Sequence, residues 1–389
     1  MRDAWTLDPD IVFLNHGSFG ACPKVVLEEQ NRLRSRLEAE PVRFMVRELP
    51  VLHAQARTAL GAFIGADAEE LALLPNATTA VNAVVRSLPL QPGDEILVTD
   101  HEYNACRNVA DFVAARRGAV VRTASIPYPV ASPEDALAPL VEALTDRTRL
   151  VMVDHITSST ALVFPVEALA SLLEERGIDF LIDGAHAPGQ VPFDLRRLPK
   201  AFYTGNAHKW LCTPKGSAFL RVPRDRQHEI RPAVISHGAN APTGRQSRFR
   251  QEFDWCGTDD PTPYLCLPAA LDFMEKAMPG GFPAVMQRNH ELVVEGRRIL
   301  TDALGLEPPA PESMLGSMAS LTLPARVVEG ELGAWDMDPL QERLLDEEQI
   351  EVPLFPWPAP GQRQLRISAQ LYNTRDDYLR LASALTKLL

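Results

Sequence analysis

Between about residue 56 and residue 222, short apolar runs alternate with stretches of helical periodicity, and this alternation constrains the fold more than any other feature of the chain. Such a pattern is typical of βαβ units around a mostly parallel sheet flanked by helices. The expected strands are residues 94–100, 119–126, 149–156, 179–183, 201–204 and 217–222, and the expected helices are residues 77–88, 104–118 and 165–177. The sequence therefore predicts an α/β fold, which presents its ligands at the carboxyl ends of its strands.

The pattern changes after residue 265. Two helical stretches are followed by a proline cluster at 306–312 and then by a mixture of strand-like and helix-like segments. We therefore expect a large domain over residues 1–265 and a smaller C-terminal α+β domain over residues 266–389. A second proline-rich stretch, 352–361, fits either a loop near the active site or a rigid crossing on the surface.

The charge balance and the cysteines limit the classes of partner. The 389 residues include 51 acidic and 39 basic side chains, giving a net charge of −12, and no polybasic block occurs. This balance argues against nucleic acids and membrane surfaces as partners and favours a small-molecule substrate. The five cysteines form no C-x-x-C pair, and the first 20 residues lack the pattern of a secretion signal. We therefore expect a cytoplasmic protein.

Two charged residues, Asp183 and Lys209, follow predicted buried strands. Asp183 ends the run 179–183, and Lys209 comes shortly after the run 201–204. A buried carboxylate needs a cationic partner, so one interpretation is a salt bridge between two strand ends. The other is that Lys209 forms a Schiff base with pyridoxal phosphate while Asp183 pairs with the protonated ring nitrogen of that cofactor.

The stretch 73–85 has the composition of a helix start. Asn76, Thr78 and Thr79 lie where a loop enters a helix, so hydroxyl and backbone N–H groups meet at the positive end of a helix dipole. This arrangement fits a cup for a phosphate group and also fits an ordinary threonine N-cap.

A further strand end, in the stretch 98–105, carries His101 and Tyr103. Either ring could lie over a flat heteroaromatic, although a single ring at such a place is usually ordinary packing. Four strand-end signals in this chain order together favour the pyridoxal-phosphate interpretation.

These motifs resemble a known family. The runs N-A-T-T (76–79), D-H-E-Y-N-A (100–105), D-G-A-H (183–186) and H-K (208–209) are similar to those of fold-type I pyridoxal-phosphate enzymes of aminotransferase class V. The segment FLNHGSFGACP (13–23) is similar to the isopenicillin N epimerase-like branch. The resemblance extends from about residue 11 to residue 380. It implies a homodimer with active sites at the subunit interface, and an N-terminal segment, 1–24, that packs on the small domain.

The resemblance also implies roles for individual residues. Lys209 would form the internal aldimine, Asp183 would contact the pyridine nitrogen, and His186 would approach the phenolic oxygen. The phosphate would be held by Asn76, Ala77, Thr78, Asn206 and His208, with Thr258 supplied by the neighbouring subunit. Tyr103 is preferred to His101 as the ring that stacks on the cofactor. The substrate would be bound by Asn15, His16 and Arg366, whose guanidinium can pair with a carboxylate in a bidentate way.

The implied reaction begins when Lys209 removes the Cα proton of an amino acid and a quinonoid intermediate forms. Reprotonation on the opposite face gives epimerisation or racemisation, for which Tyr103, His101 and His155 are candidate acids. His155 also fits a satisfied core histidine. Loss of a β-substituent would give a carbon–sulfur lyase, and proton return to the cofactor would give an aminotransferase. We expect an epimerase first, a lyase second and an aminotransferase third.

Three other classes are disfavoured. Cysteine desulfurases of this family need a cysteine shortly before the carboxylate-binding arginine, and residues 342–365 contain none. A non-catalytic pyridoxal-phosphate sensor would carry a DNA-binding head, for which the 12 residues before Phe13 are too few. A nicotinamide-binding enzyme would need a G-x-G-x-x-G motif after the first strand, and none follows it.

Overall fold

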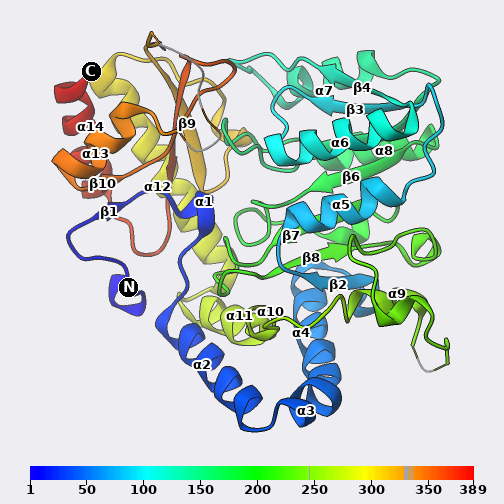
Figure 1. Cartoon of the computed structure of the whole chain (residues 1–389). Coiled ribbons are helices and arrows are strands. Elements are labelled where there is room, and N and C mark those ends of the chain that lie inside the picture. The colour runs from blue at the N-terminus through cyan, green and yellow to red at the C-terminus, as the bar shows by residue number, and fades with distance from the viewer. Residues whose placement is uncertain (245, 328–332, 334–335) are drawn as a thin grey trace.

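The computed structural model describes the whole chain except residues 245, 328–332 and 334–335. Its largest element is a seven-stranded sheet of order β2-β8-β7-β6-β5-β3-β4 (Figure 1). The strands are β2 (Leu71–Leu74), β3 (Glu95–Thr99), β4 (Val120–Ala124), β5 (Thr148–Asp154), β6 (Asp179–Asp183), β7 (Phe202–Asn206) and β8 (Ala218–Arg221). β8 runs antiparallel to both of its neighbours, whereas β3 to β7 pair in parallel. The predicted α/β fold with a mostly parallel sheet is confirmed.

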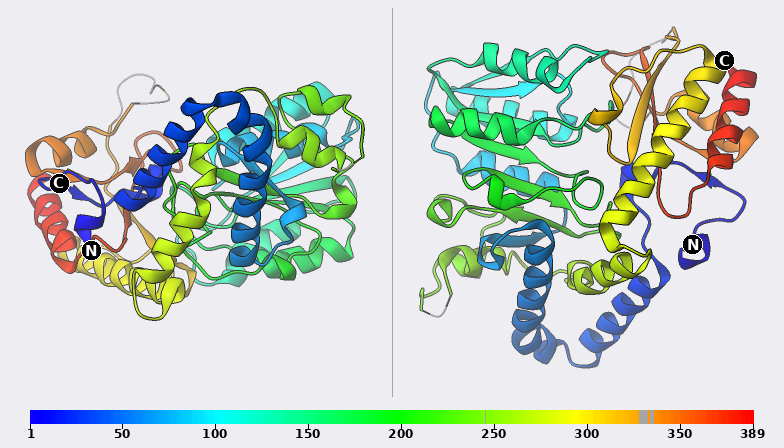
Figure 2. Two further views of the ribbon diagram at one scale, coloured as in Figure 1. Left: turned by 90° about the horizontal axis from the view of Figure 1, so that it is seen from below. Right: turned by 180° about the vertical axis from the view of Figure 1, so that it is seen from behind.

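Helices cover both faces of this sheet (Figure 2). Side chains alternate between the faces along each strand. In β5, Val151 and Val153 pack in the core that contains α8, whereas Leu150 and Met152 pack in the core that contains α5 and α6. Because both faces are buried, the central strands are mostly apolar, as is usual in parallel sheets, whereas the edge strand β4 is partly exposed.

The helices occupy most of the segments between strands. They are α1 (His16–Phe19), α2 (Lys24–Ala39), α3 (Pro41–Arg43), α4 (Leu49–Ile64), α5 (Ala77–Ser87), α6 (Asn104–Arg117), α7 (Pro133–Ala143), α8 (Val166–Glu175), α9 (Arg248–Phe253), α10 (Thr262–Leu265), α11 (Leu267–Lys276), α12 (Gly281–Leu304), α13 (Pro339–Glu348) and α14 (Arg375–Leu388). No helix in the described ranges combines the length and apolar character needed to cross a membrane.

A second sheet lies in the C-terminal part of the chain. Strands β9 (Met318–Leu323), β11 (Leu354–Phe355) and β12 (Arg363–Ser368) form an antiparallel sheet of order β11-β12-β9, which packs on α12 and α14. Near the N-terminus, β1 (Val12–Phe13) pairs in parallel with β10 (Ile350–Glu351). The N-terminal segment therefore contacts the C-terminal part of the chain, as the resemblance implied.

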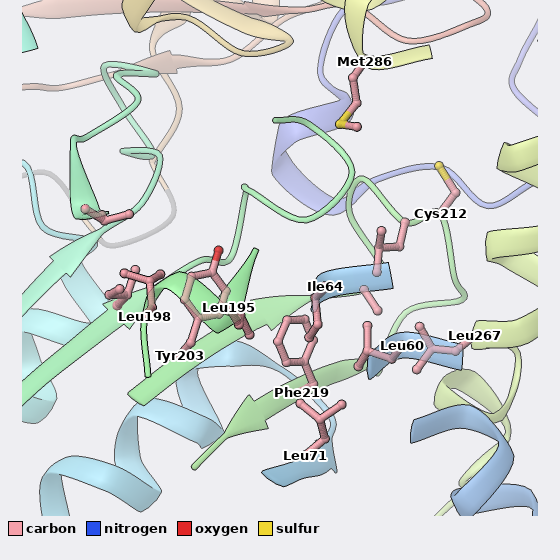
Figure 3. Close-up of a cluster of buried hydrophobic side chains, with 14 of the residues drawn as sticks. Leu60, Ile64, Leu71, Leu195, Leu198, Tyr203, Cys212, Phe219, Leu267 and Met286 are labelled. Atoms are coloured by element: carbon pink, nitrogen blue, oxygen red, sulfur yellow. The ribbon is translucent and has the colours of Figure 1, made fainter. Parts of the chain in front are cut away.

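Apolar contacts continue across the predicted domain boundary at residue 265. Leu267 of α11 lies beside Leu60 and Ile64 of α4 in the core under the large sheet (Figure 3). In α12, Met286 belongs to this same core, whereas Val293 belongs to the core of the C-terminal sheet. One helix thus joins the two cores, and the boundary at 265 stays a prediction.

Candidate active site

A cavity of about 190 Å³ lies at the carboxyl ends of β5, β6 and β7. Nine of the predicted site residues line it: Asn76, Ala77, Thr78, Tyr103, Asp183, His186, Asn206, His208 and Lys209. A larger hollow of about 280 Å³ beside Arg226 contains none of them. The prediction that the site lies at the carboxyl ends of the strands therefore grouped residues that are up to 133 positions apart in the sequence and that line one cavity.

Asp183 is the last residue of β6 and is 2% exposed. Its Oδ1 accepts a hydrogen bond of 2.8 Å from the backbone N–H of Ala185, and its Oδ2 accepts one of 3.1 Å from the thiol of Cys106. Burial raises the pKa of Asp183, while Cys106, Ala185 and Lys209 oppose this rise. These donors stabilise the anion, and a carboxylate held in this way suits a protonated ring nitrogen.

Lys209 does not form the salt bridge with Asp183 that was one interpretation of the sequence; within the described residues, no such ion pair occurs. Its Nζ lies 3.0 Å from Nε2 of His186 instead. Burial and the nearby Arg366 lower the pKa of Lys209 to about 7. A large share of this lysine is therefore neutral at physiological pH, as a nucleophile or a general base must be.

The start of α5 forms the end of the cavity that suits a phosphate. The side chain of Asn76 caps the helix by accepting a hydrogen bond of 2.8 Å from Thr79 N–H. Asn206 Oδ1 accepts one of 2.9 Å from Ala77 N–H, which ties the end of β7 to the helix start. The hydroxyl of Thr78 and the positive end of the helix dipole thus face the same cavity as His208.

Arg366 on β12 is a buried cation, only 2% exposed. Its Nη1 donates to the carbonyl oxygen of Ser158 at 2.7 Å, and its Nη2 donates to Oγ of Ser18 at 3.1 Å. Both serines line the cavity, whereas Arg366 itself is not among the lining residues and contacts the cavity wall through these serines. The guanidinium also lies over the ring of Phe355, 4.8 Å from its centroid.

No carboxylate in the described part of the chain forms an ion pair with Arg366. Burial lowers the pKa of Arg366 to about 9. A buried cation without a counter-ion is costly to a fold, and the cost is offset when an anion binds. The site therefore fits the carboxylate of a bound molecule.

Asn15 and His16 were predicted to bind the substrate, and the structure places neither in the lining of the cavity. Asn15 donates to Glu351 at 2.8 Å and accepts a hydrogen bond from Ser18. Nε2 of His16 lies 3.0 Å from the carbonyl oxygen of Lys209. Both side chains are buried and contact Ser18 and the Lys209 backbone, and their role in binding the substrate stays a prediction.

His101 and His155 also lie outside the lining. Nδ1 of His101 is 2.8 Å from the hydroxyl of Thr160, and its ring packs against Trp357. Nδ1 of His155 is 2.9 Å from the hydroxyl of Tyr203, a core residue (Figure 3). Nε2 of His101 has no hydrogen-bond partner among the described residues, and the role of either histidine as an acid stays a prediction.

Tyr103 differs from these histidines because it lines the cavity and is 47% exposed. This placement agrees with the preference for Tyr103 over His101 as the ring beside the cofactor. Trp357 donates to the backbone of Asp100, so the stretch 352–361 passes close to this strand end. Thr258 is exposed and outside the cavity of its own chain. Its role across a subunit interface stays a prediction.

Sequence reasoning missed several lining residues: Ser18, Phe19, Asp154, Ile156, Ser158 and Ala185. Asp154 carried the clearest signal, because it ends a predicted strand just as Asp183 does. Asp154 and Ile156 line the cavity, whereas His155 between them does not, as alternation at a strand end would place them. Ser18 and Ser158 had no such signal, since their partner Arg366 is more than 200 residues away.

The fold and this site define a fold-type I pyridoxal-phosphate enzyme. A model of the family "Aminotransferase class-V" matches residues 12–329. The chain belongs to this family. It is an enzyme, and its cofactor is pyridoxal phosphate, for which the Asp183 anion, the near-neutral Lys209 and the start of α5 form a matching set.

Relatives of the chain include proteins named as epimerases and proteins named as desulfhydrases or lyases. The chain is 37% identical, over 100% of its length and 97% of the relative's, to an isopenicillin N epimerase of Streptomyces clavuligerus. It is 32% identical, over 96% of its length and 82% of the relative's, to a putative L-cysteine desulfhydrase 1 of Oryza sativa subsp. japonica. The solved complex of the cystine C–S lyase C-DES with cysteine persulfide has a similar fold, with a TM-score of 0.82 at 24% identity over 97% of this chain and 98% of that chain.

Proposed function

We propose that the protein is an amino-acid epimerase or racemase, which inverts the configuration at Cα. When bound, pyridoxal phosphate supplies an electron sink that makes the Cα proton acidic. Arg366 holds the substrate carboxylate, and Lys209 removes the proton from one face. Tyr103 returns a proton to the other face. Burial raises the pKa of Tyr103, so its hydroxyl keeps its proton at neutral pH.

The observation that carries this proposal is that Lys209 and Tyr103 line one cavity although they come from different strand ends. In a two-base inversion, one group takes the Cα proton and a second group returns a proton on the opposite face, and these two side chains supply both groups. The epimerase relative, which is matched over the whole chain, supports the same reaction.

The cofactor contacts belong to the proposal as well. Asp183 pairs with the ring nitrogen, and His186 approaches the phenolic oxygen. The phosphate is held by Asn76, Ala77, Thr78, Asn206 and His208, with Thr258 reaching the site from a second subunit. We expect the enzyme to act as a homodimer in the cytoplasm.

A carbon–sulfur lyase is the second candidate. Relatives named L-cysteine desulfhydrase are 29–32% identical to the chain over nearly its whole length, and a C–S lyase shares its fold. The same Lys209 and Asp183 would serve that reaction, with a leaving group on Cβ of the substrate.

Incubation of the enzyme with single L-amino acids in deuterated water tests the proposal. We expect at least one of them to yield both enantiomers with deuterium at Cα, because the returning proton comes from exchangeable groups. Proton NMR and chiral chromatography measure the two products. Release of pyruvate and ammonia from cysteine, without a D-enantiomer from any amino acid, would favour the lyase instead.

A further inference from the structure

Two carboxyl groups, those of Asp154 and Asp183, line the cavity, and the buried carboxyl group of Glu102 interacts with both. The register of the parallel strands β5 and β6 pairs Asp154 directly with Asp183, so the two side chains leave the same face of the sheet at adjacent strand ends. Glu102, in the turn before α6, has both side-chain oxygens buried, and Glu102 and Asp154 shift the pKa of each other. Carboxyl groups that share a buried site cannot all be ionised.

Hydrogen-bond donors are divided unequally among these groups. Asp183 accepts from Ala185 and Cys106, as described above. In contrast, Oδ1 of Asp154 and both side-chain oxygens of Glu102 are buried and find no donor among the described residues. Asp154 is 4% exposed and lines the cavity. A buried acceptor without a donor is costly, and a proton on one of the two carboxyls supplies the missing donor.

The surrounding charges also favour a proton on Asp154 or Glu102 and an anionic Asp183. Burial, followed by Asp154 and Asp183, raises the pKa of Glu102 well above its usual value, and burial and Asp183 raise that of Asp154. The other titratable or charged groups that act on these carboxyls are Lys209, Arg107, Cys106 and Tyr103. Glu102 first, and then Lys209, oppose the rise at Asp154, and Arg107 opposes the rise at Glu102. Asp183, which has two donors of its own, is the group best able to remain an anion.

We propose that Asp154 and Glu102 hold one proton between them and thereby keep Asp183 ionised towards the cofactor. Asp154 and Glu102 are then positioning residues of the active site. Without a donor from Glu102, Asp154 competes with Asp183 for a proton, and the charge that faces the ring nitrogen is reduced. The effect on the cofactor rests on the proposed contact of Asp183 with the ring nitrogen. The proton shared by Asp154 and Glu102 does not depend on which reaction the enzyme catalyses.

Infrared spectroscopy of the holoenzyme tests the shared proton. We expect the carbonyl band of a protonated carboxylic acid at neutral pH, and we expect Glu102→Gln to remove it because an amide donates to Asp154 without a titrating proton. Glu142→Gln, an exposed position on α7, is the matched control and should keep the band. A band of equal size in Glu102→Gln and the wild type would overturn the proposal.

The dependence of Tm on pH is a second test of the shared proton, because a change in packing alone would not alter this dependence. The pKa of Glu102 is higher in the fold than the ~4.3 of an unfolded glutamate, so protonation of Glu102 stabilises the folded protein. This contribution to the free energy of unfolding is fully present below about pH 4 and is lost as pH rises through the pKa of the folded state. As pH rises above about 4, the Tm of the wild type should therefore fall more than the Tm of Glu102→Gln. Identical pH profiles for the two proteins would contradict the proposal.

Cofactor affinity tests the link to Asp183. Glu102→Leu removes the donor, and we expect it to raise the Kd for pyridoxal phosphate by about tenfold or more, which corresponds to a change of one pKa unit. Glu102→Gln should keep the affinity that Glu102→Leu loses, as measured by equilibrium dialysis. If both variants bind the cofactor like the wild type, Asp154 and Glu102 do not position Asp183. None of these three measurements uses substrate, so failure of the epimerase proposal would leave their outcome unchanged.

Discussion

Lys209→Ala should lower turnover by at least about a thousandfold and should prevent borohydride from fixing the cofactor to the protein. The lysine is the one residue with an amine in the lining of the cavity, and its lowered pKa of about 7 lets it act as a base near neutral pH. Its removal takes away both the covalent attachment and the group that removes the Cα proton. Stopped assays and mass spectrometry after borohydride treatment measure the two effects.

Lys200→Ala is the matched control for this substitution, because Lys200 is exposed and pairs only with Asp225 on the surface. It should behave like the wild type in both assays. The fold of Lys209→Ala should be intact. Burial disfavours the charged form of the Lys209 amine, so removing this amine takes away a group that is costly to bury. Turnover by Lys209→Ala close to that of the wild type would rule out the assigned role.

Arg366→Gln should have the second-largest effect. The loss of one partner of a buried charge pair costs about 2–5 kcal/mol, which corresponds to a fall in kcat/KM of about 30-fold to several thousand-fold. The physical reason is that the substrate carboxylate would enter a buried place whose counter-charge is gone. Steady-state kinetics with the best amino-acid substrate measure this loss.

An amine that lacks the carboxylate sharpens this test. Such an amine gains nothing from Arg366, so its affinity as an inhibitor should be similar in Arg366→Gln and in the wild type. Arg375→Gln, at an exposed ion pair with Glu295, is the control for the loss of an arginine charge on the surface. If the amine loses as much affinity as the amino acid, Arg366 supports the site structurally and does not bind the carboxylate.

The centre of the site could be predicted from the sequence because its residues follow the strand pattern. Apolar runs mark where the strands end, and parallel strands bring those ends together. Asp183, Lys209 and the start of α5 at Ala77 therefore could be placed together without coordinates. Strand β2 could not be predicted in this way, because Leu and Ala favour helices and only pairing with β8 makes this segment a strand.

The direction of side chains near the motifs was harder to predict. Asn15 and His16 belong to the N-terminal motif, yet they contact Ser18 and the Lys209 backbone instead of the cavity. The motif shows that this segment lies near the site, but the local backbone conformation decides which of its side chains face the cavity. For His155, the alternation of side chains in a strand already separates it from the neighbouring Asp154 and Ile156.

The most direct test of the account is the stereochemical outcome with Tyr103→Phe in deuterated water. If Tyr103 returns the proton opposite Lys209, this variant should still exchange Cα hydrogen for deuterium, because Lys209 remains, but the recovered amino acid should keep its configuration. Chiral chromatography with mass spectrometry follows exchange and inversion together. Inversion by Tyr103→Phe at the rate of the wild type would contradict the central claim that Lys209 and Tyr103 act on opposite faces of one carbon.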